Sequence, residues 1–401
     1  MGGGARYRDK AMPQRKIPAA FMRGGTSKAI VFNRADLPDD RAEWDAIFLA
    51  ALGSPDPYGR QLDGMGGGIS SLSKICVVGP SSRPDADVDY TFAQVAVDKG
   101  IVGYGANCGN MSSAIGPFAV DEGMVAVDGP EALVRIYNTN TKKLIHSRFR
   151  LDDGAAAVEG DFELQGVGGT GAPVRLEFHD PGGAGTGKLL PTGNVVDEIE
   201  APGMGRVEAS LVDAANPCVF VLAEAVGLDG TEAPADIDAM KDVMAKLESV
   251  RARAAVLMGI AKTADEATER SPSVPFIGMV APPQDAVTLA GAHLSAADGD
   301  LTARMVSSGN THRALPLTGA LCTAVAARIV GTVVHRMTRP AEDAEADLRI
   351  LQPSGVLPVA CTVRRSNVDG GWVGEQAAVY RTQRRLFEGR VLVPVSRLKA
   401  S

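Results

Sequence analysis

The sequence predicts an α+β protein built from two similar β-barrel-like units, each wrapped around one apolar helix. Short strands rich in β-branched residues alternate with glycine-containing turns along most of the 401 residues. Each half also contains one stretch that is apolar nearly all round, residues 110–123 and 318–334, and such a helix is buried. Cys108 in "NCGN" falls against Thr318 in "LTGA", at the start of each stretch. This match suggests an internal duplication.

The duplication predicts two domains, residues 17–190 and 191–401, and the last strand can return to the first domain. The glycine- and proline-rich segment "HDPGGAGTGKLLPTGN" lies at the boundary. Residues 1–16 are basic and glycine-rich without an apolar stretch, so we predict a disordered tail and no signal peptide.

Two further helices are predicted from apolar residues at helical spacing. Residues 41–53, "RAEWDAIFLAALG", show this spacing and end in glycine. Residues 233–259 form a longer stretch of the same kind. The remaining segments read mainly as strands and turns.

Composition excludes several classes of protein. The formal net charge of −7 gives no support to nucleic-acid binding, and no run of about 18 apolar residues predicts a membrane span. The five cysteines show no paired spacing, and the five histidines form no zinc motif. We therefore expect a reduced, cytoplasmic protein without a metal.

Two glycine-rich segments resemble nucleotide-binding loops but depart from them. "GGAGTGKL" ends in Leu189 where a phosphate loop needs a hydroxyl for Mg²⁺, and Pro191 discourages the following helix. "GVGGTG" at residues 166–171 is followed by a strand rather than by the helix of a dinucleotide site. We expect neither segment to bind a nucleotide.

Several segments rich in glycine, serine and threonine are candidates for holding an anion. In the first half these are "RGGTSKA", "DGMGGGISSLSK" and "GANCGN", and in the second half "AANPC" and "SSGNTHRALPLTG". Such segments present backbone N–H groups and hydroxyls at close range to a carboxylate or phosphate. His312 and Arg313 belong to the last segment and read either as surface or capping residues or as anion ligands.

Cys108 is the strongest candidate for a catalytic residue. It stands at the predicted start of a buried helix, where the positive end of the helix dipole favours a thiolate. The alternative is a small cysteine that only packs. Flanking Asn107, Gly109 and Asn110 favour the functional interpretation, because a packing cysteine needs no turn residues around it.

Lys74 ends a polar run and begins the apolar strand "ICVV". Its side chain is expected either to enter a cleft or to reach the surface. A lysine desolvated beside other cations can act as a base near neutral pH.

The motifs together resemble the PrpF-type isomerases, a group with 2-methylaconitate cis–trans isomerase, 4-oxalomesaconate tautomerase or Δ-isomerase, and aconitate or methylitaconate Δ-isomerases. The resemblance rests on "FMRGGTSK", "GSPDPYGRQLDGMGGGISSLSK", "DVDYTFAQV", "NCGNMSSAIGPFA" and "HRALPLTGALCTAVAA". It runs from about residue 17 to the C-terminus and is strongest over residues 17–125. It implies a diaminopimelate-epimerase-like fold, with two similar domains and a site between them.

The resemblance also implies roles for single residues. Cys108 matches the first catalytic cysteine of the epimerases, and Thr318 stands where their second cysteine is found. Because a threonine hydroxyl is a poor base, this departure implies an isomerase rather than a two-thiol racemase. Lys74 matches a lysine implicated in proton transfer, and Asn216-Pro217 resembles a substrate-binding Asn-Pro.

The predicted function is therefore a cofactor-independent isomerase that moves a double bond, or changes its cis–trans geometry, in an unsaturated tricarboxylate. Lys74 or Cys108 takes a proton, and backbone N–H groups hold the dienolate charge. No metal or organic cofactor is expected. The candidate substrate-binding residues are Arg23, Gly24, Gly25, Thr26, Ser27, Ser71, Ser73, Asn107, Gly109, Asn110, Asn216, Ser308, His312, Thr318 and Gly319.

The choice of tricarboxylate rests on "GGGISSLSK" before the lysine. Oxalomesaconate enzymes of the family tend to carry an Asp-Pro there, so the Ser-Ser form favours 2-methylaconitate or aconitate. The alternatives are a 4-oxalomesaconate tautomerase of aromatic catabolism, a tricarboxylate-binding protein without turnover, and a proline- or hydroxyproline-type racemase. A homodimer is one alternative for the oligomeric state, which the sequence does not determine.

Overall fold

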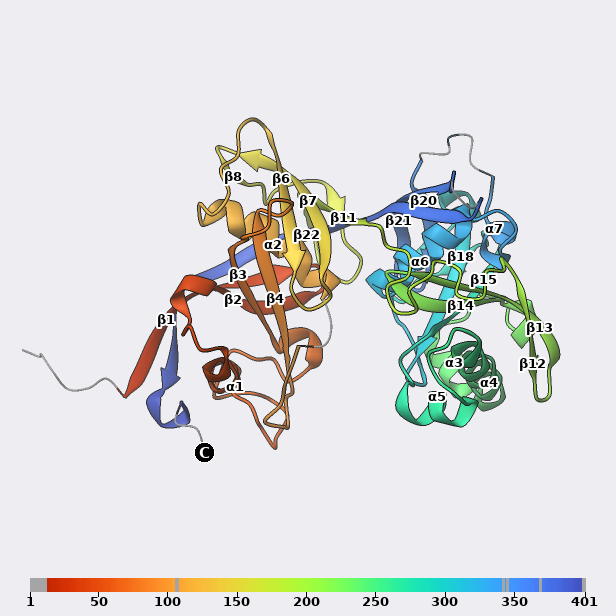
Figure 1. Ribbon diagram of the computed structural model, residues 1–401, viewed down its shortest axis with the longest axis horizontal. Helices are drawn as coiled ribbons and strands as arrows, with labels where there is room; N and C mark the ends of the chain where they lie inside the picture. The colour runs from red at the N-terminus through yellow and green to blue at the C-terminus, as the bar shows by residue number, and fades with distance from the viewer. Residues whose placement is uncertain (1–12, 105–107, 341–342, 344–345, 368–369, 399–401) are drawn as a thin grey trace, which may run out of the picture. The chain divides into compact units, whose positions relative to one another are not determined.

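The computed structural model describes residues 13–104, 108–340, 343, 346–367 and 370–398 (Figure 1). The chain forms two compact units, unit 1 with Met1–Val174 and Arg381–Ser401, and unit 2 with Arg175–Tyr380. Two strands, β11 (Pro173–His179) and β22 (Trp372–Pro394), begin in one unit and end in the other. The division thus lies before the predicted boundary at residue 190, and the C-terminal segment belongs with unit 1.

The described residues of unit 1 combine strands with the helices α1 and α2. β1 begins at Gln14, so the last residues of the predicted tail are in a strand; residues 1–12 lie outside the described part. The elements of unit 1 are β1 (Gln14–Gly24), β2 (Ser27–Asn33), α1 (Trp44–Leu52), β3 (Lys74–Pro80), β4 (Val88–Val95), β5 (Val102–Gly103), α2 (Gly109–Asp121), β6 (Glu131–Asn138), β7 (Lys143–Asp152), β8 (Ala155–Ala156), β9 (Phe162–Glu163) and β10 (Thr170–Gly171), with short 3₁₀ turns η1 (Arg34–Asp36), η2 (Arg41–Glu43), η3 (Ser70–Leu72) and η6 (Val395–Arg397).

The strands of unit 1 follow a mixed order. β22 and β2 flank β1, both antiparallel to it, and β2 continues into parallel β3 and then antiparallel β4. The β3–β4 register pairs Lys74 with Gln94 and Cys76 with Phe92. Because side chains alternate along a strand, these four lie on one face.

That face is covered by α2, which packs against β1, β2, β3, β6, β7 and β8 (Figure 1). Its side chains from Met111 to Val120 are all buried, as the apolar pattern predicts. A separate core holds α1, where Phe48 stacks on Phe32 of β2 with ring centroids 5.9 Å apart. Two layers of apolar contacts therefore fix β2 and β3 in place.

Unit 2 has a larger helical share. Its elements are β12 (Asp197–Ala201), β13 (Gly205–Ala214), β14 (Asn216–Leu222), η4 (Glu224–Val226), α3 (Pro234–Ala239), α4 (Lys241–Leu257), α5 (Ala264–Arg270), β15 (Phe276–Ala281), β16 (Ala286–Val287), β17 (His293–Leu294), η5 (Ala296–Asp298), β18 (Leu301–Ser307), β19 (Asn310–Thr311), α6 (Leu317–Arg328), α7 (Val333–Met337), β20 (Leu348–Gln352) and β21 (Gly355–Arg365).

The second apolar helix, α6, packs against β13, β14 and β21 and against α7. In the sheet of unit 2, antiparallel β12, β13 and β14 continue through parallel β15 to antiparallel β18. The mixed α/β character is thus confirmed, with strands packed on one apolar helix in each unit. The barrel-like closure and the pseudo-symmetry stay predictions.

Two predicted helices are shorter than expected. The helix over residues 233–259 is divided, because Met240 has ψ 78° and separates α3 from α4. The helix over residues 318–334 ends at Arg328, where Ile329 is extended and Gly331 has a φ of 96°. In both places local backbone geometry interrupts a continuous apolar pattern.

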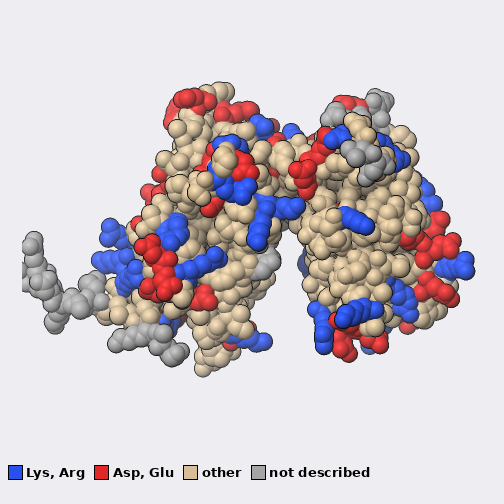
Figure 2. All heavy atoms as spheres, in the orientation of Figure 1, with Lys and Arg blue, Asp and Glu red and all other residues tan. Residues whose placement is uncertain are grey.

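The surface carries both basic and acidic side chains, as the composition of the sequence predicts. Lys and Arg side chains are interspersed with Asp and Glu on the visible face of each unit (Figure 2). No helix among the described residues is both long enough and apolar enough to cross a membrane.

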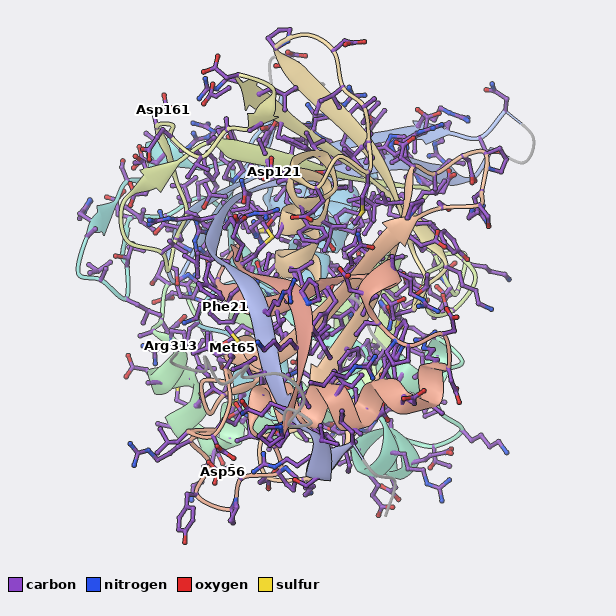
Figure 3. The ribbon with its side chains drawn as sticks, turned by 90° about the vertical axis from the view of Figure 1, so that its left-hand side faces the viewer. Phe21, Asp56, Met65, Asp121, Asp161 and Arg313 are labelled. Carbon is purple, nitrogen blue, oxygen red and sulfur yellow. The ribbon has the colours of Figure 1, made fainter. Side chains whose placement is uncertain are left out.

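The loop between α1 and Lys74 is held in place by several hydrogen bonds. Asp56, labelled in Figure 3, accepts hydrogen bonds from the backbone N–H groups of Tyr58, Arg60 and Gln61. The buried Gln61 amide donates to Ser54 Oγ and to Ser73 Oγ, at 2.8 and 2.7 Å. The loop therefore holds the residue directly before Lys74.

We expect Gly64→Ala to destabilise this loop. A Cβ at Gly64 would lie 2.1 Å from the backbone nitrogen of Gly53, which cannot move aside as a side chain can. The melting temperature should fall, corresponding to about 1–3 kcal/mol of overpacking. Gly100→Ala is the matched control, because nothing lies within 4 Å of its added Cβ. Equal melting temperatures for both variants, measured by differential scanning fluorimetry, would contradict this role of Gly64.

Candidate active site

Lys74 is the first residue of β3, and it points inward. Its side chain is only 8% exposed, which decides between the two orientations left open by the sequence. Nζ donates a 2.6 Å hydrogen bond to Gln94 Oε1 and lies 5.0 Å from the centroid of the Phe92 ring. The amine is thus held between one polar acceptor and one aromatic face.

Gln94 is itself fixed by the backbone before β3. Its Nε2 donates to the carbonyl oxygens of Ser70 and Ser73, at 3.0 and 2.9 Å. These two bonds leave Oε1 facing Lys74 and define which way the amide points. The position of Nζ therefore depends on the turn that ends at Ser73.

Cys108 is the N-cap residue of α2 and is half-buried. Its side chain makes no capping hydrogen bond, while its carbonyl oxygen accepts from the Ser112 N–H and hydroxyl. The thiol stands at the end of the helix where backbone N–H groups lack helical partners. Gly109 and Asn110 form the first turn, and Asn107 lies outside the described residues.

Cys76 is a buried thiol whose pKa responds to both Lys74 and Cys108. It follows Lys74 on the same face of β3, is fully buried, and donates to Tyr90 Oη at 3.8 Å. Burial raises the pKa of Cys76, charge at Cys108 raises it further, and charge at Lys74 lowers it. Lys74 and Cys108 therefore both influence the charge of one buried thiol. Burial likewise raises the pKa of Tyr90 well above its ordinary value.

The turn between β1 and β2 reaches the first turn of α2. Gly25 has a φ of 53°, and Asn110 Nδ2 donates to Thr26 Oγ1 at 3.0 Å. A Cβ on Gly25 would lie 2.4 Å from Asn110 Oδ1, so only glycine fits there. Gly24 and Ser27 close the turn as a register pair.

Protein groups occupy part of the expected anion cradle. The Gly25 N–H donates to the Thr382 carbonyl oxygen at 2.9 Å. Arg23 Nη1 donates to the carbonyl oxygens of Gly25 and Thr382 and to Thr382 Oγ1. These donors serve the junction of β1 with β22, so we leave them out of the proposed anion shell.

The serines before Lys74 differ from each other. Ser73 is fully buried, and its hydroxyl donates to the Val95 carbonyl oxygen while accepting from Gln61. Ser71 is half-buried in the η3 turn. Of the two, Ser71 retains a side chain that a ligand of unit 1 could reach.

In unit 2, His312 and the start of α6 surround Phe276 and Met305. The His312 ring centroid lies 5.8 Å from that of Phe276, and Nε2 is 2.8 Å from Ser307 Oγ. A Cβ on Gly319 would lie 2.4 Å from Met305 Sδ. Burial lowers the pKa of His312. Thr318 is half-buried in the first turn of α6, where N–H groups lack helical partners.

Asn216 and Ser308 lie in other turns of unit 2. Asn216 follows Ala215, which has a φ of 62°, and its Nδ2 donates to the carbonyl oxygen of Pro217. Ser308 has a φ of 50° in the exposed β18–β19 turn, where its N–H donates to the Pro272 carbonyl oxygen.

The phosphate-loop-like segment binds an internal carboxylate. Asp213 Oδ2 accepts from the Gly185 N–H, the Thr186 N–H and the Thr186 hydroxyl, at 2.8, 2.6 and 2.8 Å. A Cβ on Gly185 would lie 2.6 Å from Pro217 Cγ. The loop thus supports the Asn216-Pro217 turn.

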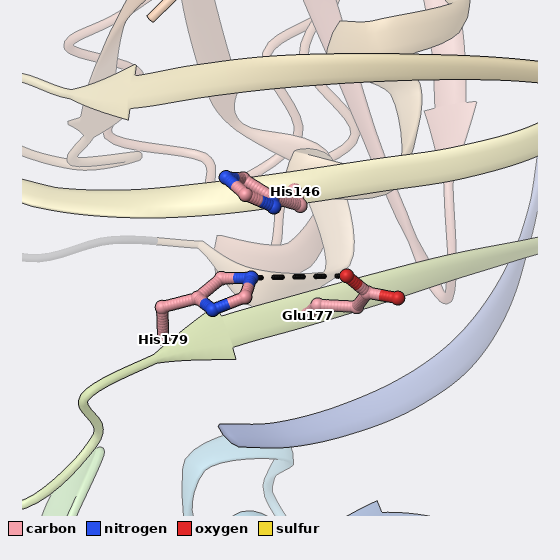
Figure 4. Close-up of side chains that lie close together, drawn as sticks. All are labelled: His146, Glu177 and His179. Atoms are coloured by element: carbon pink, nitrogen blue, oxygen red, sulfur yellow. Dashed lines mark ion pairs between the residues drawn. The ribbon is translucent and has the colours of Figure 1, made fainter. Parts of the chain in front are cut away.

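A titratable pair lies apart from these groups, on β11. Glu177 and His179 form an ion pair of 3.7 Å (Figure 4), and Arg175 Nε lies 3.2 Å from the same carboxylate. Arg175 and His179, on the same strand, compensate the negative charge of Glu177. We therefore assign no ligand to the pair.

Comparison with known proteins decides the family. The family described as PrpF protein matches residues 14–394. The chain belongs to the PrpF family. It is therefore an isomerase of that family, as the sequence motifs predict, and it shares the mixed α/β fold of its relatives.

The relatives cover nearly the whole chain. This PrpF-family isomerase is 44% identical to the 3-methylitaconate isomerase of Eubacterium barkeri, over 96% of this chain and 99% of the relative. It is 40% identical to the 2-methyl-aconitate isomerase of Cupriavidus necator, over 96% and 98%. The (4E)-oxalomesaconate Delta-isomerase of Novosphingobium sp. strain KA1 is 38% identical, over 96% and 99%. A crystal structure of methylitaconate-delta-isomerase superposes with a TM-score of 0.90 at 44% identity, covering 97% of this chain and 98% of that chain.

Two residues near the candidate site were not predicted from the sequence. Gln94 is the last residue but one of β4, whose sequence shows only the alternation of a strand. Its pairing with Lys74 depends on a register that one strand does not reveal. Arg381 belongs to the basic run "YRTQRRLF" near the C-terminus, where nothing indicates burial. It is nevertheless 6% exposed and donates to Asn110.

We expect His312 to make unit 2 less stable in acid. Its pKa is lower in the fold than in the unfolded chain, so the unfolded chain binds the extra proton below about pH 6.5 and stability falls there. Between about pH 7.5 and about pH 5.5, wild type should lose more stability in urea unfolding than His312→Gln. His293→Gln, at an exposed position, is the control and should follow wild type. An identical pH dependence for His312→Gln and wild type would refute this assignment.

Proposed function

We propose that this PrpF-family isomerase moves a double bond, or changes its cis–trans geometry, in an unsaturated tricarboxylate of the 2-methylaconitate or aconitate type. The reaction proceeds by proton transfer, with Lys74 and Cys108 as the catalytic residues. The observation that carries the proposal is the buried Lys74 amine, which shares the neighbourhood of Cys76 with the Cys108 thiol at the start of α2.

The chemistry needs only a proton that leaves and returns. Lys74 in its amine form, or Cys108 as a thiolate, removes a C–H proton next to the double bond and a carboxylate. The electron pair spreads into a dienolate, which lowers the barrier when donors hold its charge. Return of the proton at the other end of the three-carbon allylic unit moves the double bond. Return to the same carbon after rotation changes its geometry.

The protein supplies donors for that charge at the start of a helix in unit 1. These are the first N–H groups of α2, with the Asn110 and Thr26 side chains beside them. Unit 2, taken by itself, has a separate candidate for binding a carboxylate at the start of α6, with Thr318 and His312. Helix N-termini favour anions through both free N–H groups and the helix dipole.

A second candidate substrate is an unsaturated dicarboxylate of the 3-methylitaconate type. The observation that favours it is the 44% identity to a relative with that name, together with the close match to a solved structure. The Ser70-Ser71 pair before Lys74 supports either of these over an oxalomesaconate.

The substrate can be assigned by incubating the protein with 2-methylaconitate, cis-aconitate, trans-aconitate, 3-methylitaconate and 4-oxalomesaconate in D₂O. Proton NMR then follows the vinyl, methyl and methylene signals. We expect deuterium uptake with double-bond movement in 2-methylaconitate or an aconitate. Turnover of 3-methylitaconate alone would establish the second candidate, and no turnover of any acid would refute the proposed substrate class.

Lys74→Met and Cys108→Ala should each lower kcat by at least about 100-fold, because each removes a proton-transfer group. Lys99→Met is the control, since Lys99 is exposed, and it should keep wild-type kcat. The rates are measured on the acid that the NMR experiment selects. A Lys74→Met protein that is folded and turns over within a few-fold of wild type would show that the amine is not the base.

A further inference from the structure

Gln94 carries a half-buried amide that the proposed chemistry leaves without a role. It is the register partner of Lys74 in the antiparallel β3–β4 pair. Its Oε1 accepts the 2.6 Å hydrogen bond from Lys74 Nζ. This bond directs the amine through an uncharged group rather than through an ion pair.

Three hydrogen bonds determine which way the Gln94 amide points. Nε2 donates to the carbonyl oxygens of Ser70 and Ser73, at 3.0 and 2.9 Å, while Oε1 accepts from Lys74. Turning the amide over would place its oxygen against the two carbonyl oxygens and its NH₂ group against the amine. A carboxylate of the same length would also face the carbonyl oxygens, because it has acceptors only. The position therefore suits an amide, which supplies one acceptor and two donors.

A second amide, that of Gln61, holds the same turn. Gln61 is fully buried, and its Nε2 donates to Ser54 Oγ and Ser73 Oγ, while its Oε1 accepts from the Gly68 N–H at 3.0 Å. Its backbone has a φ of 54°, which is uncommon for a residue with a side chain. Such a conformation persists only where the surrounding structure holds it. The two amides thus lie in series between the loop after α1 and Lys74.

Phe92 also contacts the amine, but its ring does not fix a direction. The centroid lies 5.0 Å from Lys74 Nζ. A cation is attracted anywhere over a ring face within about 6 Å of the centroid. A hydrogen bond instead requires a donor–acceptor distance of about 2.7–3.2 Å and a nearly linear angle. The direction of Nζ is therefore set by Gln94.

We propose that Gln94 is a positioning residue. Its amide places Lys74 Nζ for proton transfer and passes on to the amine the geometry of the turn that Gln61 holds. The consequence for turnover rests on the proposed function, in which Lys74 exchanges a proton with the substrate. The place of Nζ does not, because it can be determined without substrate.

The kinetic test uses Gln94→Met, which keeps the length of the side chain and removes the amide. A base misplaced by about 1 Å can slow a reaction about 100-fold, so we expect kcat to fall about 10- to 100-fold while KM changes less than about threefold. Gln94→Glu should not restore kcat, because its carboxylate lacks the two donors. Gln376→Met, at a half-buried position on a strand of unit 2, is the control and should keep both constants.

Three kinetic outcomes would overturn the proposal. A folded Gln94→Met protein with kcat close to wild type would show that the amine needs no such support. A higher KM with unchanged kcat would place Gln94 in substrate binding instead. Wild-type kcat in Gln94→Glu would show that the two donors to the turn do not matter.

The series arrangement has its own test, because no hydrogen bond joins the Gln61 side chain to Lys74. Gln61→Met should lower kcat in the same direction as Gln94→Met. Since both act through the turn before Lys74, the double variant should lose less than the product of the two single losses. Multiplicative losses would show that the two amides act independently and would contradict the series.

Crystal structures without substrate separate this proposal from the proposed function. In wild type, Nζ must lie within hydrogen-bond distance of Gln94 Oε1, and the absence of this bond overturns the proposal even if no variant folds. In Gln94→Met we expect Nζ to move by about 1 Å or more, and an unmoved Nζ overturns it too. If Lys74→Met is slow and Gln94→Met is not, only the role of Gln94 is lost. If neither is slow, Lys74 is not the base, and the proposed function loses that residue.

Discussion

The candidate site of unit 1 depends on how closely the β1–β2 turn approaches α2. A Cβ on Gly24 would lie 2.7 Å from the Asn110 carbonyl oxygen, and one on Gly25 would lie 2.4 Å from Asn110 Oδ1. Two consecutive residues without side chains therefore let a strand turn rest on the first turn of a buried helix. That contact orients Asn110 in the first turn of α2, directly after the N-cap residue Cys108 and Gly109.

Some polar groups in this region make hydrogen bonds within the protein, and the others are left for a ligand. Arg23 and the Gly25 N–H bond to Thr382, and the Ser73 hydroxyl bonds to Val95 and Gln61. A buried polar group must find a partner, and nearby backbone often supplies it. In the proposed function, the groups left for the substrate are the Lys74 amine, the Cys108 thiol and the first N–H groups of α2.

Much of this arrangement could be predicted from the sequence, because local patterns determine it. The buried helix, the place of Cys108 at its start and the strand after Lys74 all follow from short-range signals. The burial of Arg381 could not be predicted in this way, since Arg381 is buried where it contacts Asn110, 271 residues earlier in the chain. Likewise, the break at Met240 reflects backbone geometry that an apolar pattern does not encode.

The return of residues 381–401 to unit 1 has a consequence for synthesis on the ribosome. β1 emerges before unit 2, whereas the part of β22 that pairs with it emerges after unit 2. Until then, one edge of β1 is without its strand partner, and an open edge is prone to pair with other chains. Unit 1 therefore acquires its complete sheet, and with it Arg381 and Thr382, only after the ribosome has finished unit 2.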